Sequence, residues 1–219
     1  MKGLVIGASG GIGRALVQNW VEDGLDVAAV SRGTNGLDLT DPDSVDRVLG
    51  RLRGPFHRVV VATGILVSSA TRPEKTLAEI QAAEMTKLLA VNTVGVALVL
   101  RHLPRLLPRN SASATGVLTA RVGSIADNKL GGWYGYRASK AAANMLVRGA
   151  AVEIGRTHRN AVIAALHPGT VETAFTSNYP GHTKMSAETA AAHLTAVLTG
   201  LEKEQNGGFY DYNGAEVPW

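Results

Sequence analysis

Short apolar runs alternate with longer amphipathic segments along the chain. The apolar runs predict strands at residues 3–6, 26–30, 37–39, 58–63, 116–122, 161–166 and 208–212. The run at 58–63 is rich in β-branched valines, which is typical of a parallel strand covered on both faces. A sheet of such strands needs helices on either side of it.

The amphipathic segments between these runs predict the helices. They lie at residues 14–23, 41–52, 73–83, 84–107, 134–155 and from 186 onward. Pro104 should kink or end the helix at 84–107, because proline lacks the N–H that a helix interior requires. The alternation of strand and helix predicts an α/β fold, with a single doubly wound parallel sheet and helices on both faces. We expect one domain over residues 1–219.

Composition narrows the class of protein. Hydrophobic residues make up 45% of the sequence and charged residues 18%, which suits a compact α/β protein. Cysteine is absent, which excludes disulfides and thiolate metal sites and favours a reducing compartment, so we predict a cytoplasmic protein. The six histidines lack metal-ligand spacing, so no metal site is predicted.

Charge and hydropathy bear on the partners. The net charge is +4 and the basic residues are scattered, so we expect no nucleic-acid partner and favour small anionic ligands. The chain enters a predicted strand at once, so no signal peptide is expected. The apolar runs are too short or too interrupted to span a bilayer, so we expect no membrane association.

A glycine-rich segment follows the first predicted strand. It reads Gly-Ala-Ser-Gly-Gly-Ile-Gly and leads into a predicted helix. In this arrangement free backbone N–H groups and the helix dipole bind a phosphate. The spacing differs from the Gly-x-Gly-x-x-Gly of other dinucleotide binders. We predict phosphate binding rather than an unliganded turn, with contacts from Gly7, Ser9, Gly10, Gly11, Ile12 and Gly13.

Ser31 and Arg32 follow the second predicted strand, where a dinucleotide-binding fold meets the adenosine ribose. An acidic residue there would bind a ribose 2′-hydroxyl, whereas an arginine pairs with a 2′-phosphate. Residues 29–33 contain no aspartate or glutamate. The segment therefore favours NADP over NAD, and the alternative is that Arg32 is a solvated surface residue.

The stretch from Val122 to Lys140 carries a candidate catalytic pair. Tyr136 and Lys140 are four residues apart on a predicted helix, so phenol and ammonium project from one face. A nearby ammonium should lower the tyrosine pKa and make the phenol a competent general acid or base. The alternative is an ordinary surface pair. Ser124 follows the apolar run at 116–122.

Two other positions invite a functional interpretation. Asn92 lies within the apolar segment at 84–107, although asparagine is a poor helix former and a buried amide needs partners. It is either a satisfied core residue or a placed functional amide. Residues 167–173 leave the carboxyl end of a predicted strand, where ligands bind in open α/β sheets.

Together these features resemble the short-chain dehydrogenase/reductase family over essentially the whole chain. The matching marks are Gly7-x-x-x-Gly11-Ile12-Gly13, Asp38, Asn92-x-x-Gly95, Ser124, Tyr136-x-x-x-Lys140 and Pro168-Gly169 with Thr173. The short length and the ending Gly-Gly-Phe-Tyr-Asp-Tyr-Asn-Gly-Ala-Glu-Val-Pro-Trp are similar to the C-factor and sniffer-like branch. The resemblance implies a Rossmann fold and an NADP(H)-dependent carbonyl reductase or alcohol dehydrogenase, with NAD the less favoured cofactor.

The resemblance also implies a role for each member of a Ser-Tyr-Lys-Asn set. Tyr136 would exchange a proton with the substrate oxygen, and Lys140 would lower the tyrosine pKa and hold the nicotinamide ribose. Ser124 would hydrogen-bond the carbonyl, and Asn92 would hold a water that links Lys140 to a proton relay. Further cofactor contacts would come from Asp38, Leu39, Ala62, Thr63, Gly64, Pro168, Gly169, Val171 and Thr173.

Some positions are less typical of the family. After the strand at 58–63 the family usually carries Asn-Asn-Ala-Gly, whereas this chain reads Val-Ala-Thr-Gly, and Arg137 after the tyrosine is unusual. Trp133, Phe175 and Tyr179 suggest an apolar substrate pocket, and exposed loop aromatics are the alternative.

We therefore expect an NADPH-dependent reductase whose partner is a small carbonyl or alcohol substrate. The alternative is a cofactor-binding sensing or signalling protein with little catalytic activity, against which the intact Ser-Tyr-Lys-Asn set argues. The helices around Asn92 and Asn144 carry more apolar surface than one sheet face can cover. A homodimer or homotetramer built on these helices is expected.

Overall fold

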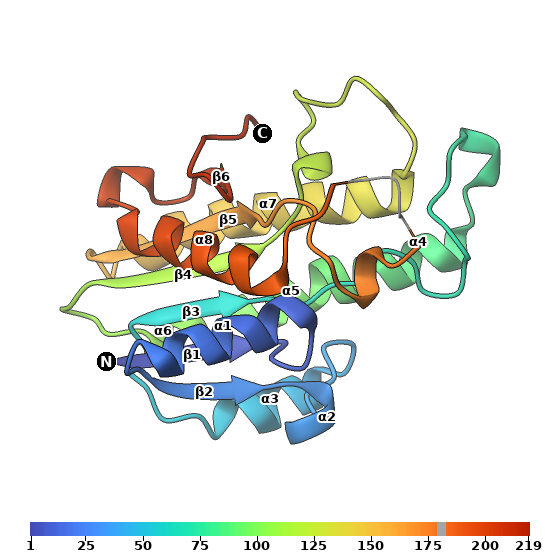
Figure 1. Ribbon diagram of the computed structural model, residues 1–219. Helices are drawn as coiled ribbons and strands as arrows, with labels where there is room; N and C mark the ends of the chain where they lie inside the picture. Colours follow the sequence, from blue (N-terminus) through green and yellow to red (C-terminus); the bar gives the residue numbers. More distant parts are fainter. Residues whose placement is uncertain (179–182) are drawn as a thin grey trace.

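The computed structural model describes residues 1–178 and 183–219, and these form one parallel sheet in the order β2-β1-β3-β4-β5-β6 (Figure 1). The strands are β1 (Lys2–Ile6), β2 (Asp26–Val30), β3 (Arg58–Val61), β4 (Ser113–Leu118), β5 (Ala161–His167) and β6 (Phe209–Asp211). β1 pairs with β2 on one side and with β3 on the other, so the strand order reverses there. The predicted doubly wound parallel sheet is confirmed.

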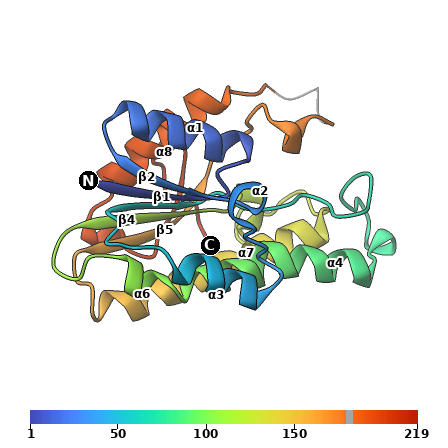
Figure 2. The same ribbon diagram turned by 90° about the horizontal axis from the view of Figure 1, so that it is seen from below.

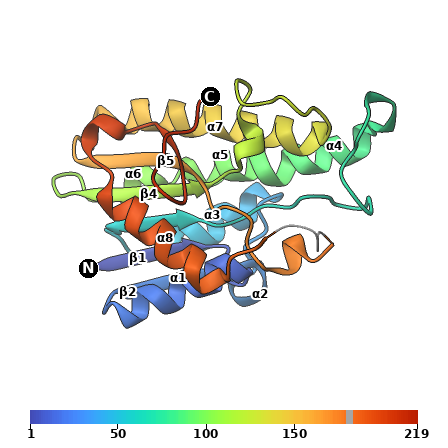
Figure 3. The same cartoon turned by 45° about the horizontal axis from the view of Figure 1, so that its top comes forward.

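Helices cover both faces of this sheet (Figure 2). One face carries α1 (Gly11–Glu22) and α8 (Ala187–Gly200) over a core that includes the buried Trp20. The other face carries α3 (Pro42–Gly50), α5 (Gly95–Leu100), α6 (Leu103–Leu106) and α7 (Tyr134–Gly155). α4 (Ala82–Leu89) continues towards α5 and lies beside α7 (Figure 3).

Local sequence signals set several helix ends. Asp41 caps α3 by accepting a hydrogen bond from the Asp43 amide, and Pro42 takes the first helical position, where its missing N–H costs nothing. Ser186 caps α8 by accepting from the Thr189 amide. These ends agree with the expected helix starts.

The predicted strand at 37–39 is not a strand in the structure. After β2 the chain forms the one-turn helix α2 (Arg32–Asn35) and then runs without ladder pairing to α3. Leu37 and Leu39 are both buried in the core, which explains their alternation with polar residues. A crossover that returns to a parallel sheet needs at least about 10–12 residues. The six residues 31–36 between β2 and the predicted strand are too few for such a crossover.

The helix predicted at 84–107 is broken. α4 passes into a π-helical turn at Ala90–Val94, which is followed by α5, and α6 begins after a turn at Arg101. The helix predicted at 73–83 is only a 3₁₀ turn at Leu77–Glu79. The Glu79 carboxylate accepts a hydrogen bond from the Lys75 amide, which stabilises this turn instead of a longer helix.

Ala82–Leu100 is apolar and long enough to cross a membrane by length and composition alone, with a mean hydropathy of 1.5. In the structure its inner side, which includes Leu88, Val96 and Val99, is buried against the rest of the chain. This packing is that of a helix that covers a protein core.

β4 ends earlier than the apolar run predicted. The strand stops at Leu118, and Arg121–Gly123 forms a 3₁₀ turn that packs on α7. Thr119 and Ala120, rather than Ser124, therefore leave the carboxyl edge of the sheet. This four-residue difference changes which side chains face the site.

Candidate active site

A cavity of about 260 Å³ lies at the carboxyl ends of β1, β3, β4 and β5. Most of the predicted site residues line it, namely Gly10, Gly11, Ile12, Gly13, Ala62, Thr63, Gly64, Tyr136, Lys140, Pro168, Gly169, Val171 and Thr173. This edge contains the reversal of strand order at β1, the position where open α/β sheets bind their ligands. The sheet thus brings together segments that are far apart in the sequence.

The glycine-rich loop brings backbone segments close together at the start of α1, and we call this loop the glycine cradle. Gly7 has a left-handed φ of 91°, and a side chain at Gly13 would collide with the Gly7 carbonyl oxygen. A side chain at Gly11 would collide with the Thr173 methyl group, so the start of α1 packs closely against the segment after β5. Gly10 caps α1 without a side-chain hydrogen bond, and the first turn has no acidic residue. The helix N-terminus is therefore suited to an anion.

Gly7, Ser9, Ser31, Arg32, Asp38 and Leu39 do not line the cavity. Ser31 caps α2 by accepting from the Thr34 amide at 3.3 Å, and Arg32 is exposed on this short helix. Hydrogen bonds from the Thr40 hydroxyl and amide lower the pKa of Asp38, and the charge of Arg32 adds to the effect. Arg32 thus lies near Asp38 at the outer edge of the site.

Tyr136 and Lys140 lie together on the first turns of α7, and both are buried. Lys140 Nζ is 5.8 Å from the centroid of the Tyr136 ring and donates to the Leu118 carbonyl oxygen at 3.1 Å. Burial lowers the pKa of Lys140 to about 8. Burial also raises the pKa of Tyr136, which is opposite to the expected lowering, because removing the phenol from water disfavours the phenolate.

Asn92 lies in the π-helical turn and is fully buried. Its Oδ1 accepts from the Ile65 amide at 2.8 Å, and its Nδ2 donates to the Ile65 carbonyl at 2.8 Å and to Ser139 Oγ at 3.0 Å. A side chain at Gly64 would lie 3.1 Å from Lys140 Nζ and 3.3 Å from Asn92 Oδ1. Asn92 therefore ties the segment after β3 to α7 beside the lysine, and π-bulges of this kind are common at functional sites.

The structure does not bring Ser124 to the cavity. Ser124 is buried after the 3₁₀ turn, and its Oγ accepts a hydrogen bond from the Asp127 amide at 3.0 Å. The cavity wall at the end of β4 consists of Leu118, Thr119 and Ala120 instead. The difference arises because β4 ends at Leu118.

Three lining residues at the end of β4 escaped the sequence interpretation, namely Leu118, Thr119 and Ala120, whereas His167 and Phe175 belong to segments that were expected at the site. Burial lowers the pKa of His167 to about 4, so its imidazole is neutral at pH 7. Within the described chain, Thr63 Oγ1, Thr119 Oγ1 and His167 Nδ1 are buried without a hydrogen-bond partner. His167 opens the segment 167–173 that was expected at the carboxyl end of the sheet, and it lines the cavity there.

Two side chains fix the loops that precede α4 and α7. Burial disfavours ionisation of Glu84, but hydrogen bonds from Ser68 and Ser69 outweigh it and lower the pKa of Glu84 to about 2. Arg137 donates to the carbonyl oxygens of Gly132 at 3.0 Å and Val122 at 3.3 Å. Arg137 therefore holds the loop before α7 in place.

Aromatic rings surround the tyrosine. The ring centroids of Trp133 and Phe175 lie 6.2 Å and 6.1 Å from that of Tyr136, which agrees with the expected apolar pocket. Tyr179, the third aromatic residue of that prediction, falls outside the described residues. The Tyr136 hydroxyl therefore lies in a part of the site that has apolar aromatic surface beside it.

Comparisons with known proteins agree with this architecture. A 1-hydroxy-2-glutathionyl-2-methyl-3-butene dehydrogenase from Rhodococcus sp. (strain AD45) is 30% identical over 229 residues, covering 99% of this chain and 98% of the relative. The C-signal protein of Myxococcus xanthus is 34% identical over 143 residues, covering 65% of this chain and 83% of the relative.

A crystal structure of a short-chain dehydrogenase/reductase from Burkholderia multivorans with bound NADP has a TM-score of 0.84 and 26% identity, covering 100% of this chain and 99% of that one. A family model described as short chain dehydrogenase matches residues 3–183. The range matched by the family model contains the glycine cradle, the ends of β1, β3, β4 and β5, and the tyrosine–lysine pair. The chain belongs to the short-chain dehydrogenase/reductase family.

Proposed function

We propose that this oxidoreductase is an NADP(H)-dependent reductase of small or medium-sized carbonyl compounds. The observation that carries the proposal is the burial of Tyr136 and Lys140 in one cavity with the glycine cradle. The similarity to a dehydrogenase of a 1-hydroxy compound and to a structure with bound NADP supports it. The test is NADPH oxidation by the purified protein with a panel of aldehydes and ketones.

The residues present fit a dinucleotide. The side-chain-free approach at Gly13 and the uncapped start of α1 would hold its pyrophosphate, and Val171 with Thr173 would hold the nicotinamide end. When bound, the reduced cofactor supplies a hydride to the carbonyl carbon. The protein contributes position, exclusion of water and control of the proton.

Tyr136 donates the proton to the substrate oxygen in this proposal. The raised pKa keeps the phenol protonated at neutral pH, which suits a general acid for reduction. Lys140 holds a positive charge next to the phenol ring and would contact the nicotinamide ribose. Asn92 positions Ile65 and Ser139, and its predicted role in holding a relay water stays a prediction. The position of Ser124 does not support its predicted contact with the carbonyl.

Arg32→Ala is expected to weaken NADPH binding by about 10- to 100-fold and to change NADH binding little. A charge-assisted contact with the 2′-phosphate is worth roughly 1.5–3 kcal/mol, and NADH has no such phosphate. The measurement is fluorescence titration with both cofactors, and Arg109→Ala, an exposed arginine on the loop before β4, is the control. Equal losses for NADPH and NADH would mean that Arg32 is structural.

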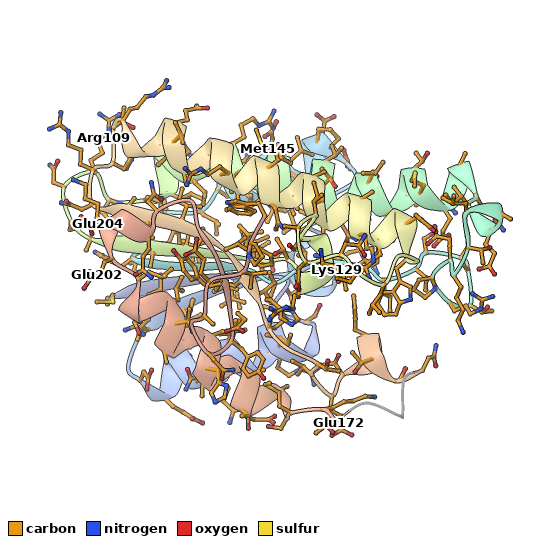
Figure 4. All side chains as sticks on the ribbon, turned by 90° about the horizontal axis from the view of Figure 1, so that it is seen from above. Arg109, Lys129, Met145, Glu172, Glu202 and Glu204 are labelled. Atoms are coloured by element: carbon orange, nitrogen blue, oxygen red, sulfur yellow. The ribbon has the colours of Figure 1, made fainter. Side chains whose placement is uncertain are left out.

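A homodimer or homotetramer is part of the proposal. Val94 after α4 and Met145 and Val152 on α7 are large apolar side chains that are more than half exposed. Figure 4 shows Met145 on the outer side of α7. Such neighbouring apolar residues support an interface along these helices.

Met145→Glu combined with Val152→Glu is expected to convert the assembly to monomers, because like charges at the interface would be desolvated on association without an opposite charge to pair with. Light scattering at micromolar concentration measures the mass. Leu130→Glu, a change at a highly exposed loop position, is the control. A wild-type monomer at that concentration would remove this part of the proposal.

The sensing alternative is favoured by one observation, the absence of Ser124 from the cavity. The similarity to the C-signal protein gives it a second basis. Wild-type protein that binds NADPH but reduces nothing across a broad carbonyl panel would make this alternative the better account. The lack of cysteine supports a cytoplasmic location for either function.

A further inference from the structure

The wall of the cavity at the end of β4 contains one hydroxyl group, and it belongs to Thr119 rather than to Ser124. Thr119 and Ala120 line this wall, and Ala120 offers only a methyl group. The Ser124 hydroxyl is already engaged by the Asp127 amide, away from the cavity. Of residues 118–124, Thr119 is therefore the one that brings a hydroxyl group to the cavity wall.

The surroundings of Thr119 give its hydroxyl no protein partner. The residue is 4% exposed, and among the described residues its Oγ1 accepts and donates no hydrogen bond. A buried hydroxyl without a partner costs free energy, so a group that lines a cavity in this state is suited to a ligand. The backbone of Thr119 is held in place, because its amide donates a hydrogen bond to the Leu166 carbonyl oxygen at 2.9 Å.

Thr119 also lies close to the proposed proton donor. Lys140 Nζ donates to the carbonyl oxygen of Leu118, the residue directly before Thr119, and Tyr136 lines the same cavity. Of the other unpartnered groups, Thr63 has its methyl group beside Gly7 at the glycine loop, so it belongs to the cofactor end. Thr119 is thus the unpartnered hydroxyl next to the tyrosine–lysine pair.

We propose that Thr119 is the second hydrogen-bond donor to the substrate carbonyl oxygen, beside Tyr136, and that Ser124 is structural. The assignment rests on the proposed carbonyl reductase function. Thr119 donates a hydrogen bond and keeps its proton, while Tyr136 transfers its proton to the oxygen that receives negative charge. A fixed donor aimed at a developing oxyanion lowers the barrier because it strengthens as the charge grows.

The test compares Thr119→Val, Thr119→Ser and Ser124→Ala with wild type. Valine keeps the shape of threonine and removes the hydroxyl, whereas serine keeps the hydroxyl. Benzaldehyde is the probe, because its ring suits the apolar surface of Trp133 and Phe175. Single-turnover reduction with saturating NADPH is expected to fall about 10²- to 10³-fold in Thr119→Val. Thr119→Ser and Ser124→Ala should stay within a few-fold of wild type, and NADPH affinity should not change.

A binding measurement separates this assignment from the proposed function. Benzamide presents the same carbonyl oxygen but is not reduced, so calorimetry with the NADP⁺ complex reports the hydrogen bond without turnover. Thr119→Val should bind benzamide about 10-fold more weakly than wild type and Thr119→Ser. If wild type reduces no carbonyl but this difference is present, the reductase function fails and the Thr119 contact stands.

Four results would overturn the assignment. Thr119→Val with wild-type benzamide affinity would show that its hydroxyl does not contact the carbonyl. Wild-type reduction by Thr119→Val, or a loss in Ser124→Ala as large as in Thr119→Val, would show that the donor is another group. A wild-type complex that binds no benzamide would have no carbonyl site at this wall.

Discussion

Tyr136→Phe is expected to lower the rate of carbonyl reduction by roughly 10²–10⁴-fold and to leave NADPH binding unchanged, because only the general acid is lost. The ring contacts with Trp133, Phe175 and the Lys140 ammonium do not need the hydroxyl, so the fold of the site should persist. NADPH titration and single-turnover reduction on the same protein samples measure the two effects separately.

The raised pKa of Tyr136 also predicts the pH dependence. The phenol is protonated throughout the neutral range, so reduction should not decline as pH rises through 7. Alcohol oxidation needs the phenolate as base, so its rate should increase with pH. Tyr134→Phe, two residues earlier on α7 and outside the cavity, is the matched control. Wild-type reduction by Tyr136→Phe would place the acid on another residue.

Lys140→Met is expected to lower turnover by roughly 10²-fold and to weaken NADPH binding about 10-fold, because the proposal gives the ammonium contacts with both the tyrosine and the ribose. The same change should stabilise the ligand-free protein. Burial lowers the pKa of Lys140 from 10.5 to about 8, and such a depression corresponds to about 3 kcal/mol against the charged form. The lost hydrogen bond to Leu118 offsets part of this, which leaves a gain of about 1–2 kcal/mol.

The stability gain should depend on pH in a defined direction. Between about pH 8 and 10.5 the unfolded chain binds more protons at Lys140 than the folded chain does, so wild-type stability rises with pH there. The advantage of Lys140→Met is therefore full below pH 8 and disappears towards pH 10.5. Urea unfolding at several pH values measures it, with the exposed Lys129→Met as control (Figure 4). A variant that is less stable than wild type at pH 7 would contradict the desolvation argument.

The sequence by itself determined the layered fold and most of the cofactor side of the site. Strand and helix periodicities depend on local side-chain alternation, so the order of elements could be predicted, as could the cap residues Asp41 and Ser186. The glycine loop was predictable for a similar reason, because only glycine allows the close approach between residues 7 and 13. The tyrosine–lysine spacing likewise fixed that the two side chains share a helix face.

The tertiary structure decided where helices and strands end and which side chains line the cavity. The apolar run at 116–122 continues past the strand because Val122 packs within a 3₁₀ turn, so pattern alone placed Ser124 at the sheet edge. The direction of the Tyr136 pKa shift also needed the structure, since it depends on how far the phenol is removed from water. Burial and the termination of a strand arise from contacts between distant segments, which no local pattern contains.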